Sequence, residues 1–137
     1  MAADGEGATR MMEVIVTGAK THEDARILAR SVTASNLVKA MVYGSDANSG
    51  RILDALGYAG VDFDPDLVDV TLLHEDEMML LVQDGVVCRI DEEKATEWMK
   101  EKRVSFLCEL KQGREGATAW GCDLTHDYVN INGDYRS

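Results

Sequence analysis

The residues best suited to bind a polar ligand lie near the two ends of the chain. Glu6 stands between two glycines, whose permissive backbone lets a carboxylate point into a binding site, although a tail residue is the simpler interpretation of the same pattern. At the other end, amides, tyrosines and hydroxyls continue to the last residue, where chains usually fray. An ordered end of this kind would place Asn132, Arg136 and Ser137 around a polar ligand. The two ends are therefore the candidate binding elements.

The sequence lacks the patterns of several familiar catalytic and metal centres. It has no GxSxG element, no phosphate-binding glycine loop and no CxxC pair. His22, His74 and His126 lie in acidic, polar surroundings, which favours solvent-exposed histidines over zinc ligands. We therefore expect no metal site and no nucleophile with its base within this chain.

Composition limits the partners that the chain can have. Its 137 residues fit one domain, and 14 basic against 25 acidic residues give a net charge of −11. That charge argues against sequence-independent nucleic-acid binding and against an anchor on anionic lipid, and no apolar run approaches the roughly 20 residues of a membrane span. Cys88, Cys108 and Cys122 are widely spaced, as expected for reduced, mostly buried thiols. We expect an intracellular protein with neither nucleic acid nor membrane as a partner.

Periodicity and turn residues predict an α/β chain. Apolar and β-branched runs predict strands at residues 12–16, 37–43, 68–73, 78–83, 86–90, 105–110 and 117–122. Capping residues and apolar spacing predict helices at residues 21–34, 50–56, 91–102 and 123–131. The interleaved order favours an α/β fold class, an α+β layered sandwich, with residues 1–10 as a loop and residues 11–137 as a single domain. Residues 1–3 are expected to be a short segment added in front of the natural sequence.

Several other residues have simple structural interpretations. Asp84 and Gly85 predict a type I′ hairpin turn. Asn48 or Ser49 is suited to cap the helix that begins near residue 50, and the acidic run at residues 75–77 is typical of a solvated turn. Trp98 is expected in the core, because large aromatic side chains usually contribute buried area. Trp120 is expected either to pack in the core, which is favoured, or to line a pocket.

Four motifs, in order along the chain, resemble one family. DGEGATR at residues 4–10 is similar to a DGEGAT[KR] signature, and GSDANSGRI at residues 44–52 is similar to a G-x-D-x-N-W-G-R-I loop. ATAWGCDLT at residues 117–125 and the end from YV at residue 128 to DYRS at residue 137 resemble the same family's terminus. The family is ornithine acetyltransferase, the bifunctional glutamate N-acetyltransferase ArgJ of arginine biosynthesis.

The resemblance implies a fold, a reaction and three site residues. It implies the C-terminal region of the DmpA/ArgJ-like fold, and transfer of an acetyl group from N2-acetylornithine to glutamate, with acetyl-CoA as a further co-substrate of some members and no other cofactor. The precursor cuts itself before a threonine, which then carries the acetyl group with its own amine as base, while donors from the other chain hold the oxyanion. Glu6, Asn132 and Ser137 fall on substrate-binding positions, Glu6 toward an amino group and the other two toward a carboxylate.

Two departures from the family pattern matter. Ser49 stands where the family loop has tryptophan. The motif that holds the self-cleaving threonine is absent, and Thr9, Thr17 and Thr21 lie outside any such context. The chain therefore resembles the C-terminal part of the β chain, and we expect its partners to be the α chain and the N-terminal part of the β chain.

These departures leave more than one function open. As an enzyme part, the chain would form one wall of a homo-oligomeric acetyltransferase and be inactive alone, in the cytoplasm or, in a eukaryote, in a mitochondrion or plastid. The alternative is a non-catalytic oligomerisation or small-ligand-binding module of the same fold. A self-processing aminopeptidase is a third possibility that rests on fold analogy, and the match at the C-terminus disfavours it.

Overall fold

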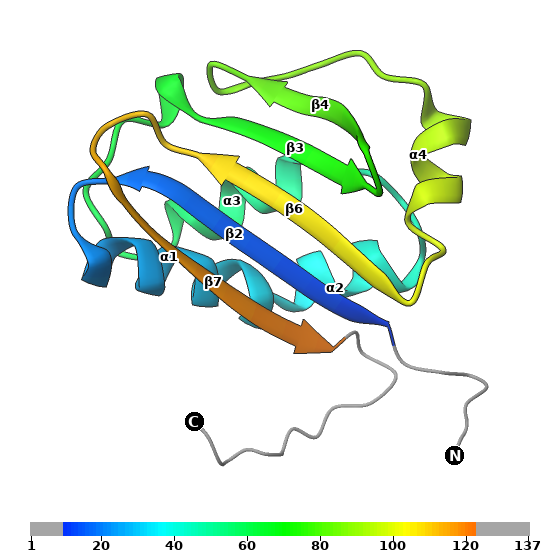
Figure 1. Cartoon of the computed structure of the whole chain (residues 1–137), viewed down its shortest axis with the longest axis horizontal. Helices are drawn as coiled ribbons and strands as arrows, with labels where there is room; N and C mark the ends of the chain where they lie inside the picture. The colour runs from blue at the N-terminus through cyan, green and yellow to red at the C-terminus, as the bar shows by residue number, and fades with distance from the viewer. Residues whose placement is uncertain (1–9, 123–137) are drawn as a thin grey trace.

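The computed structural model describes residues 10–122, which form one six-stranded sheet with helices packed against it (Figure 1). The strands are β2 (Met11–Ala19), β3 (Asp69–His74), β4 (Glu77–Gln83), β5 (Val86–Val87), β6 (Arg103–Glu109) and β7 (Glu115–Cys122). The helices are α1 (His22–Ala34), α2 (Asn36–Tyr43), α3 (Gly50–Gly57) and α4 (Glu92–Trp98), and Pro65–Leu67 forms a 3-10 turn. The predicted α/β class is confirmed, whereas the helix predicted at residues 123–131 lies outside the described residues.

The sheet has two unlike faces. Its strand order is β5-β4-β3-β6-β2-β7, in which β2 and β6 run parallel and every other neighbouring pair runs antiparallel. Figure 1 shows α1, α2 and α3 behind one face and α4 beside the turn between β3 and β4. No helix of the described part of the chain covers the other face, which we call the open face.

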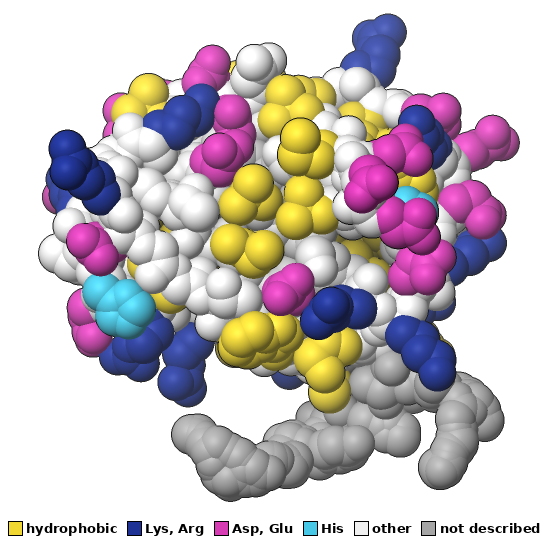
Figure 2. Space-filling view, viewed as in Figure 1, with side chains coloured by type: hydrophobic (Ala, Val, Ile, Leu, Met, Phe, Trp, Pro, Cys, Tyr) yellow, Lys and Arg dark blue, Asp and Glu magenta, His cyan; other side chains and the backbone are white. Residues whose placement is uncertain are grey.

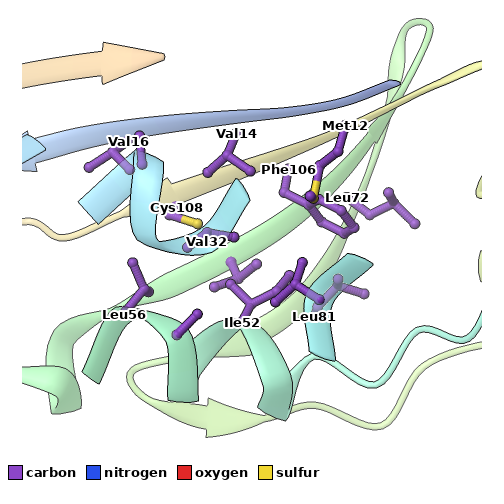
Figure 3. Packing of buried hydrophobic residues seen from close by; sticks show 14 of the residues in the cluster. Met12, Val14, Val16, Val32, Ile52, Leu56, Leu72, Leu81, Phe106 and Cys108 are labelled. Atoms are coloured by element: carbon purple, nitrogen blue, oxygen red, sulfur yellow. The ribbon is translucent and has the colours of Figure 1, made fainter. Parts of the chain in front are cut away.

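The core lies between the sheet and the three helices. Alternate residues of β2, Met12, Val14 and Val16, are fully buried, and Phe106 and Cys108 of β6 are buried beside them. Figure 3 shows these side chains packed toward Val32, Ile52 and Leu56 from the helices. The period-two burial of the strands therefore matches the apolar alternation in the sequence.

Local capping and turn chemistry account for two predicted elements. Thr21 caps α1, because its Oγ1 accepts a hydrogen bond from the Asp24 amide at 3.0 Å. Asp84 and Gly85 have φ angles of 49° and 77°, the left-handed pair that a type I′ turn requires. A Cβ at Gly85 would also lie 2.5 Å from the Pro65 carbonyl oxygen, so glycine is required there for space as well.

The strand predicted at residues 37–43 is wrong, because this segment is helix α2. The Oγ of Ser35 accepts from the Val38 amide at 3.2 Å and so caps a new helix. Val38, Met41 and Val42 are buried at the i, i+3, i+4 spacing of one helical face. Helix spacing and a cap therefore outweigh the β-branched composition that favoured a strand.

The helix predicted at residues 91–102 is shorter than expected. Asp91 caps it as predicted, since its Oδ1 accepts from the Lys94 amide at 3.1 Å, but α4 ends at Trp98. Beyond it, the Lys102 carbonyl accepts a hydrogen bond from the Met11 amide at 2.7 Å. Residues 99–102 therefore lead into the sheet instead of continuing the helix. Among residues 10–122, no helix is long and apolar enough to span a bilayer.

Candidate functional site

The sheet register brings together the points where the two candidate binding segments join the fold. Glu6, Asn132 and Ser137 themselves lie outside the described residues. The flanking strands are described: β2 and β7 run antiparallel with Met11 opposite Cys122. The start of β2 and the end of β7 therefore lie side by side at one end of the sheet (Figure 1), which we call the motif end.

Chain length limits how far the candidate residues can be from the motif end. Four residues separate Glu6 from Arg10, so their Cα atoms are at most about 14 Å apart. Ten residues separate Cys122 from Asn132, a reach of at most about 36 Å. Both limits permit the two segments to meet at the motif end.

Arg10 connects the first motif to the second. Its Nη1 donates hydrogen bonds to the Ser45 Oγ at 2.6 Å, the Val42 carbonyl at 2.8 Å and the Met99 carbonyl at 3.1 Å. Ser45 is the second residue of the 44–52 motif and is buried, with a positive φ of 52°. The motif loop is therefore held beside the start of β2. No local pattern in the sequence singles out Arg10 for this role, because these contacts span 32 to 89 residues.

The motif loop departs from the family pattern at Ser49 and matches that pattern at its other defined positions. Ser49 precedes α3 but makes no side-chain capping bond; its Oγ donates to the Leu81 carbonyl at 3.5 Å, and the residue is only 3% exposed. Ser49 therefore occupies the N-cap position of α3, as predicted, but its side chain does not make the expected capping hydrogen bond. Asp46 and Asn48 of the same loop are exposed.

Glu13 organises two polar side chains on the open face. Its Oε1 accepts from the Ser105 Oγ at 2.8 Å and its Oε2 accepts from the Trp120 Nε1 at 3.2 Å. Trp120 is 56% exposed, so its predicted place in the core is wrong. The physical reason lies in the neighbouring Gly121, where a Cβ would lie 3.1 Å from the Thr33 carbonyl oxygen. Only a small residue fits against α1 there, and alternation turns Trp120 to the open face.

The open face also carries an apolar patch. Ile15, Leu107 and Leu73 are half-buried, while Met78 and Leu80 are exposed. The register places Ile15 beside Leu107, and Leu73 beside Met78, so the patch crosses neighbouring strands. Figure 2 shows hydrophobic side chains gathered in the middle of this face. A contiguous apolar area of this kind is typical of a surface that another polypeptide covers.

His74 is not the solvated residue that its sequence context predicts. Its ring stacks on Trp98, with centroids 4.9 Å apart and planes 8° apart, and its Nε2 lies 3.7 Å from a Glu101 carboxylate oxygen. The Nδ1 is buried and has no hydrogen-bond partner among residues 10–122. His22 is exposed as predicted, with its Nδ1 3.1 Å from the Gly116 carbonyl oxygen, and His126 lies outside the described residues.

No disulfide joins the cysteines of residues 10–122. Burial raises the pKa of Cys108 to about 12, so this thiol stays protonated and unreactive near neutral pH. Cys88 and Cys122 are half-buried. Within residues 10–122, no three His, Cys, Asp or Glu side chains gather as they would around a metal ion.

Three charged side chains interact at the end of the sheet opposite Met11. Lys111 Nζ lies 3.0 Å from an Asp69 oxygen and 3.2 Å from an Asp84 oxygen. Burial raises the pKa of Asp69, but the Asp84 amide and the Lys111 ammonium outweigh it, so the pKa lies below its ordinary value. The hydrogen bonds to both carboxylates raise the pKa of Lys111. This network joins the start of β3 to residues that follow β4 and β6, at the opposite end of the sheet from the motif end.

One shallow hollow of about 260 Å³ is lined by Leu53, Gly57, Val61, Phe63, Pro65, Asp66 and Gly85. Within residues 10–122, its lining includes neither a residue of the 44–52 motif nor one of the motif end. The chemistry that the described residues support is therefore concentrated at the motif end, which can position two binding segments.

Comparison with known proteins identifies the relatives of the chain. A model of the ArgJ family matches residues 1–137. The arginine biosynthesis bifunctional protein ArgJ of Symbiobacterium thermophilum is 53% identical over 137 residues, which are 100% of this chain and 33% of that protein. The glutamate N-acetyltransferase of Methanothermobacter thermautotrophicus is 44% identical over 141 residues, 100% of this chain and 35% of its own.

A solved structure agrees with the fold. The crystal structure of the arginine biosynthesis bifunctional protein ArgJ from Bacillus halodurans superposes with a TM-score of 0.80 at 39% sequence identity, covering 96% of this chain and 60% of that chain. The chain thus spans about a third of the length of the curated relatives that it matches.

Proposed function

Because the chain belongs to the ArgJ family, we propose that it forms the C-terminal, substrate-binding part of a glutamate N-acetyltransferase of arginine biosynthesis. In this proposal, the complete enzyme moves an acetyl group from N2-acetylornithine to glutamate through an acetyl-threonine intermediate. The nucleophilic threonine is supplied by the part of the polypeptide that this chain does not span. In this proposal, that other part also determines whether acetyl-CoA serves as a co-substrate.

The observation that carries the proposal is the pairing of Met11 with Cys122. It joins the segment that bears Glu6 and the segment that bears Asn132 and Ser137 to the same end of the sheet. A site that grips an amino acid needs a carboxylate for its ammonium group and donors for its carboxylate, because buried charges must be paired. Glu6 supplies the first, and Asn132 and Ser137 supply the second.

The open face supports the proposed partner. Met78 is 71% exposed and Leu80 is 36% exposed beside half-buried Ile15, Leu73 and Leu107. We infer that the α chain and the N-terminal part of the β chain cover this apolar area in the complete enzyme. The relatives are about three times as long as this chain, which leaves ample polypeptide for that role.

An acetyl-transfer assay tests the proposal. The chain alone should produce no acetylglutamate from N2-acetylornithine and glutamate, whereas the chain expressed together with the upstream two-thirds of the Symbiobacterium relative should restore transfer. Glu6→Gln should then raise the KM for N2-acetylornithine by about 10- to 100-fold, because a charged hydrogen bond is lost. The matched control is Glu97→Gln, which alters an exposed carboxylate that pairs with Lys100, and it should leave KM unchanged.

The apolar open face also supports a second candidate, a non-catalytic module that self-associates. Sedimentation at several concentrations, together with the transfer assay, distinguishes this module from the acetyltransferase part. A chain that forms stable oligomers and gives no transfer with the upstream part would favour the module, while a strictly monomeric chain would count against it.

A further inference from the structure

The two edges of the sheet differ in how they are protected against pairing with another chain. At one edge, β5 is only two residues long, whereas β7 at the other edge has eight residues (Figure 1). Natural edge strands are usually kept short, or carry a charge or a proline, because their unpaired backbone groups accept a strand from another molecule. β7 contains no proline, and its one charged residue, Glu115, is its first. Most of this long edge therefore lacks the usual protection.

The hydrogen bonds of the sheet determine which backbone groups of β7 point outward. The Met11 amide and the Thr17 carbonyl both bond toward the β6 side, so the odd-numbered residues of β2 face β6. The even-numbered residues of β2 therefore face β7. The register pairs these even-numbered residues with Gly121, Ala119 and Ala117. The N–H and C=O groups of Thr118 and Trp120 consequently point away from β2, toward the free edge.

A contact of α1 supports this assignment independently. The Gly116 carbonyl, two positions before Thr118 and therefore on the same edge, lies 3.1 Å from the Nδ1 of His22. The first residue of α1 thus occupies one outward carbonyl. Thr118 and Trp120 are exposed, and no group among residues 10–122 pairs with their outward N–H and C=O groups. The open part of the edge begins at Thr118.

We propose that this open edge pairs with the same edge of a second copy, antiparallel and across a two-fold axis at Ala119. In this register, Thr118 lies opposite the partner's Trp120, and each such pair exchanges two N–H···O=C bonds. Only unpaired groups are used, so the Gly116 carbonyl keeps its contact with His22. One continuous sheet then runs through both copies. This inference does not depend on acetyl transfer.

The distribution of charge favours a second copy at this edge. The net charge of −11 opposes self-association in general. However, residues 75–77 and 91–93 are all acidic and lie at the β3–β4 turn and the start of α4, and Figure 2 shows acidic side chains gathered on that side, away from β7. Residues 116–122 carry no charge, so two copies meet there without repulsion between like charges. The exposed Trp120 ring also gains a cross-strand contact with the partner's Thr118.

The edge is separate from the apolar patch of the open face. Met78 lies on β4, and β3, β6 and β2 stand between β4 and β7 in the strand order. Met78→Glu therefore weakens contacts through the patch without altering the edge. All measurements of edge pairing use this variant as the background, so that any remaining association reports on β7.

The first experiment measures amide hydrogen exchange at chain concentrations on either side of the association midpoint found by sedimentation. Above the midpoint, the Thr118 and Trp120 amides should exchange about tenfold more slowly than below it. The Ala117 and Ala119 amides, which belong to the β2 ladder, should be equally protected at both concentrations. A chain that stays monomeric at millimolar concentration would overturn the inference. Association without slower exchange at Thr118 and Trp120 would overturn it as well.

The second experiment changes the edge without changing the ladder. Thr118→Pro removes an outward N–H that β2 does not use, so the chain should stay folded and its dimer should weaken at least about tenfold. The matched control, Thr118→Val, keeps the N–H and should associate like the background chain. Circular dichroism checks that both variants are folded. A folded Thr118→Pro variant that associates as strongly as Thr118→Val would contradict edge pairing.

A cross-link tests the register and does not depend on the proline variant. The two Ala119 residues would be a non-hydrogen-bonded pair with Cα atoms about 4.5 Å apart, within the range that a disulfide spans. The two Ala117 residues would be about 13 Å apart along the paired strands. In a glutathione redox buffer, Ala119→Cys should therefore form a Cys–Cys link between copies, identified by mass spectrometry, and Ala117→Cys should not. A link in both variants, or in neither, would overturn the proposed register.

Discussion

Replacing Gly121 by valine tests whether β7 is held closely enough against α1 to fix the motif end. A Cβ at this position would lie 3.1 Å from the Thr33 carbonyl oxygen and 3.2 Å from the Thr33 Cβ. Because the nearest atom belongs to the backbone of α1, it cannot rotate away. Gly121→Val must therefore push the end of β7 away from the helix.

The magnitude follows from two opposing effects. Overpacking against backbone costs about 1–3 kcal/mol, and the removal of a flexible glycine from a strand returns about 0.5–1 kcal/mol. We expect a net loss of about 1–2 kcal/mol in the free energy of unfolding. For a chain of this length, that loss corresponds to a fall in Tm of about 3–8 °C.

Thermal unfolding, followed by circular dichroism, measures the effect. The matched control is Gly57→Ala, because a Cβ at Gly57 meets no atom within 4 Å, and this variant should be as stable as the original chain or slightly more stable. In Gly121→Val, the Met11 amide region should also exchange faster, since Met11 lies opposite Cys122. A Gly121→Val variant as stable as Gly57→Ala would refute the reasoning about close packing.

Three further predictions concern the described residues. Asp69 has a lowered pKa when folded, so its contribution to stability is present above the unfolded pKa near 4 and is lost as the pH falls through the folded value; Asp69→Asn should therefore lower the urea midpoint at pH 7 but much less at pH 2, whereas the exposed control Asp62→Asn should change neither. Cys108 should resist alkylation by iodoacetamide at pH 8 while Cys88 reacts, because burial raises the pKa of Cys108 to about 12; mass spectrometry showing equal labelling in the folded chain would contradict this. Met78→Glu should reduce self-association in sedimentation experiments without lowering Tm by more than about 2 °C, since Met78 is 71% exposed on the open face.

Local signals in the sequence were sufficient for most of the elements. The caps at Thr21 and Asp91 and the Asp84-Gly85 turn each act over four residues or fewer, and the structure contains them where the sequence predicts. The segment at residues 37–43 failed for a local reason as well. Ser35 both ends α1 and caps α2, so two helices follow one another where the apolar, β-branched composition predicted a strand.

The periodicity of a single segment does not predict which residues far apart in the chain contact one another. The exposure of Trp120 depends on how closely Gly121 approaches Thr33, 88 positions earlier in the chain. The pairing of Met11 with Cys122 is a matter of strand register, which alternation within a single strand does not specify. For the candidate site, the sequence and the family resemblance supplied Glu6, Asn132 and Ser137, which lie outside the described residues. The structure added Arg10, whose contacts no local pattern predicts.

The most direct test of the central claim is an NMR titration of the isotope-labelled chain with N2-acetylornithine. If both ends of the chain hold one ligand at the motif end, the amide signals of residues 4–11 and those of residues 122–137 will shift along a single saturation curve with one Kd. Shifts at only one end, or none at millimolar ligand, would contradict the account.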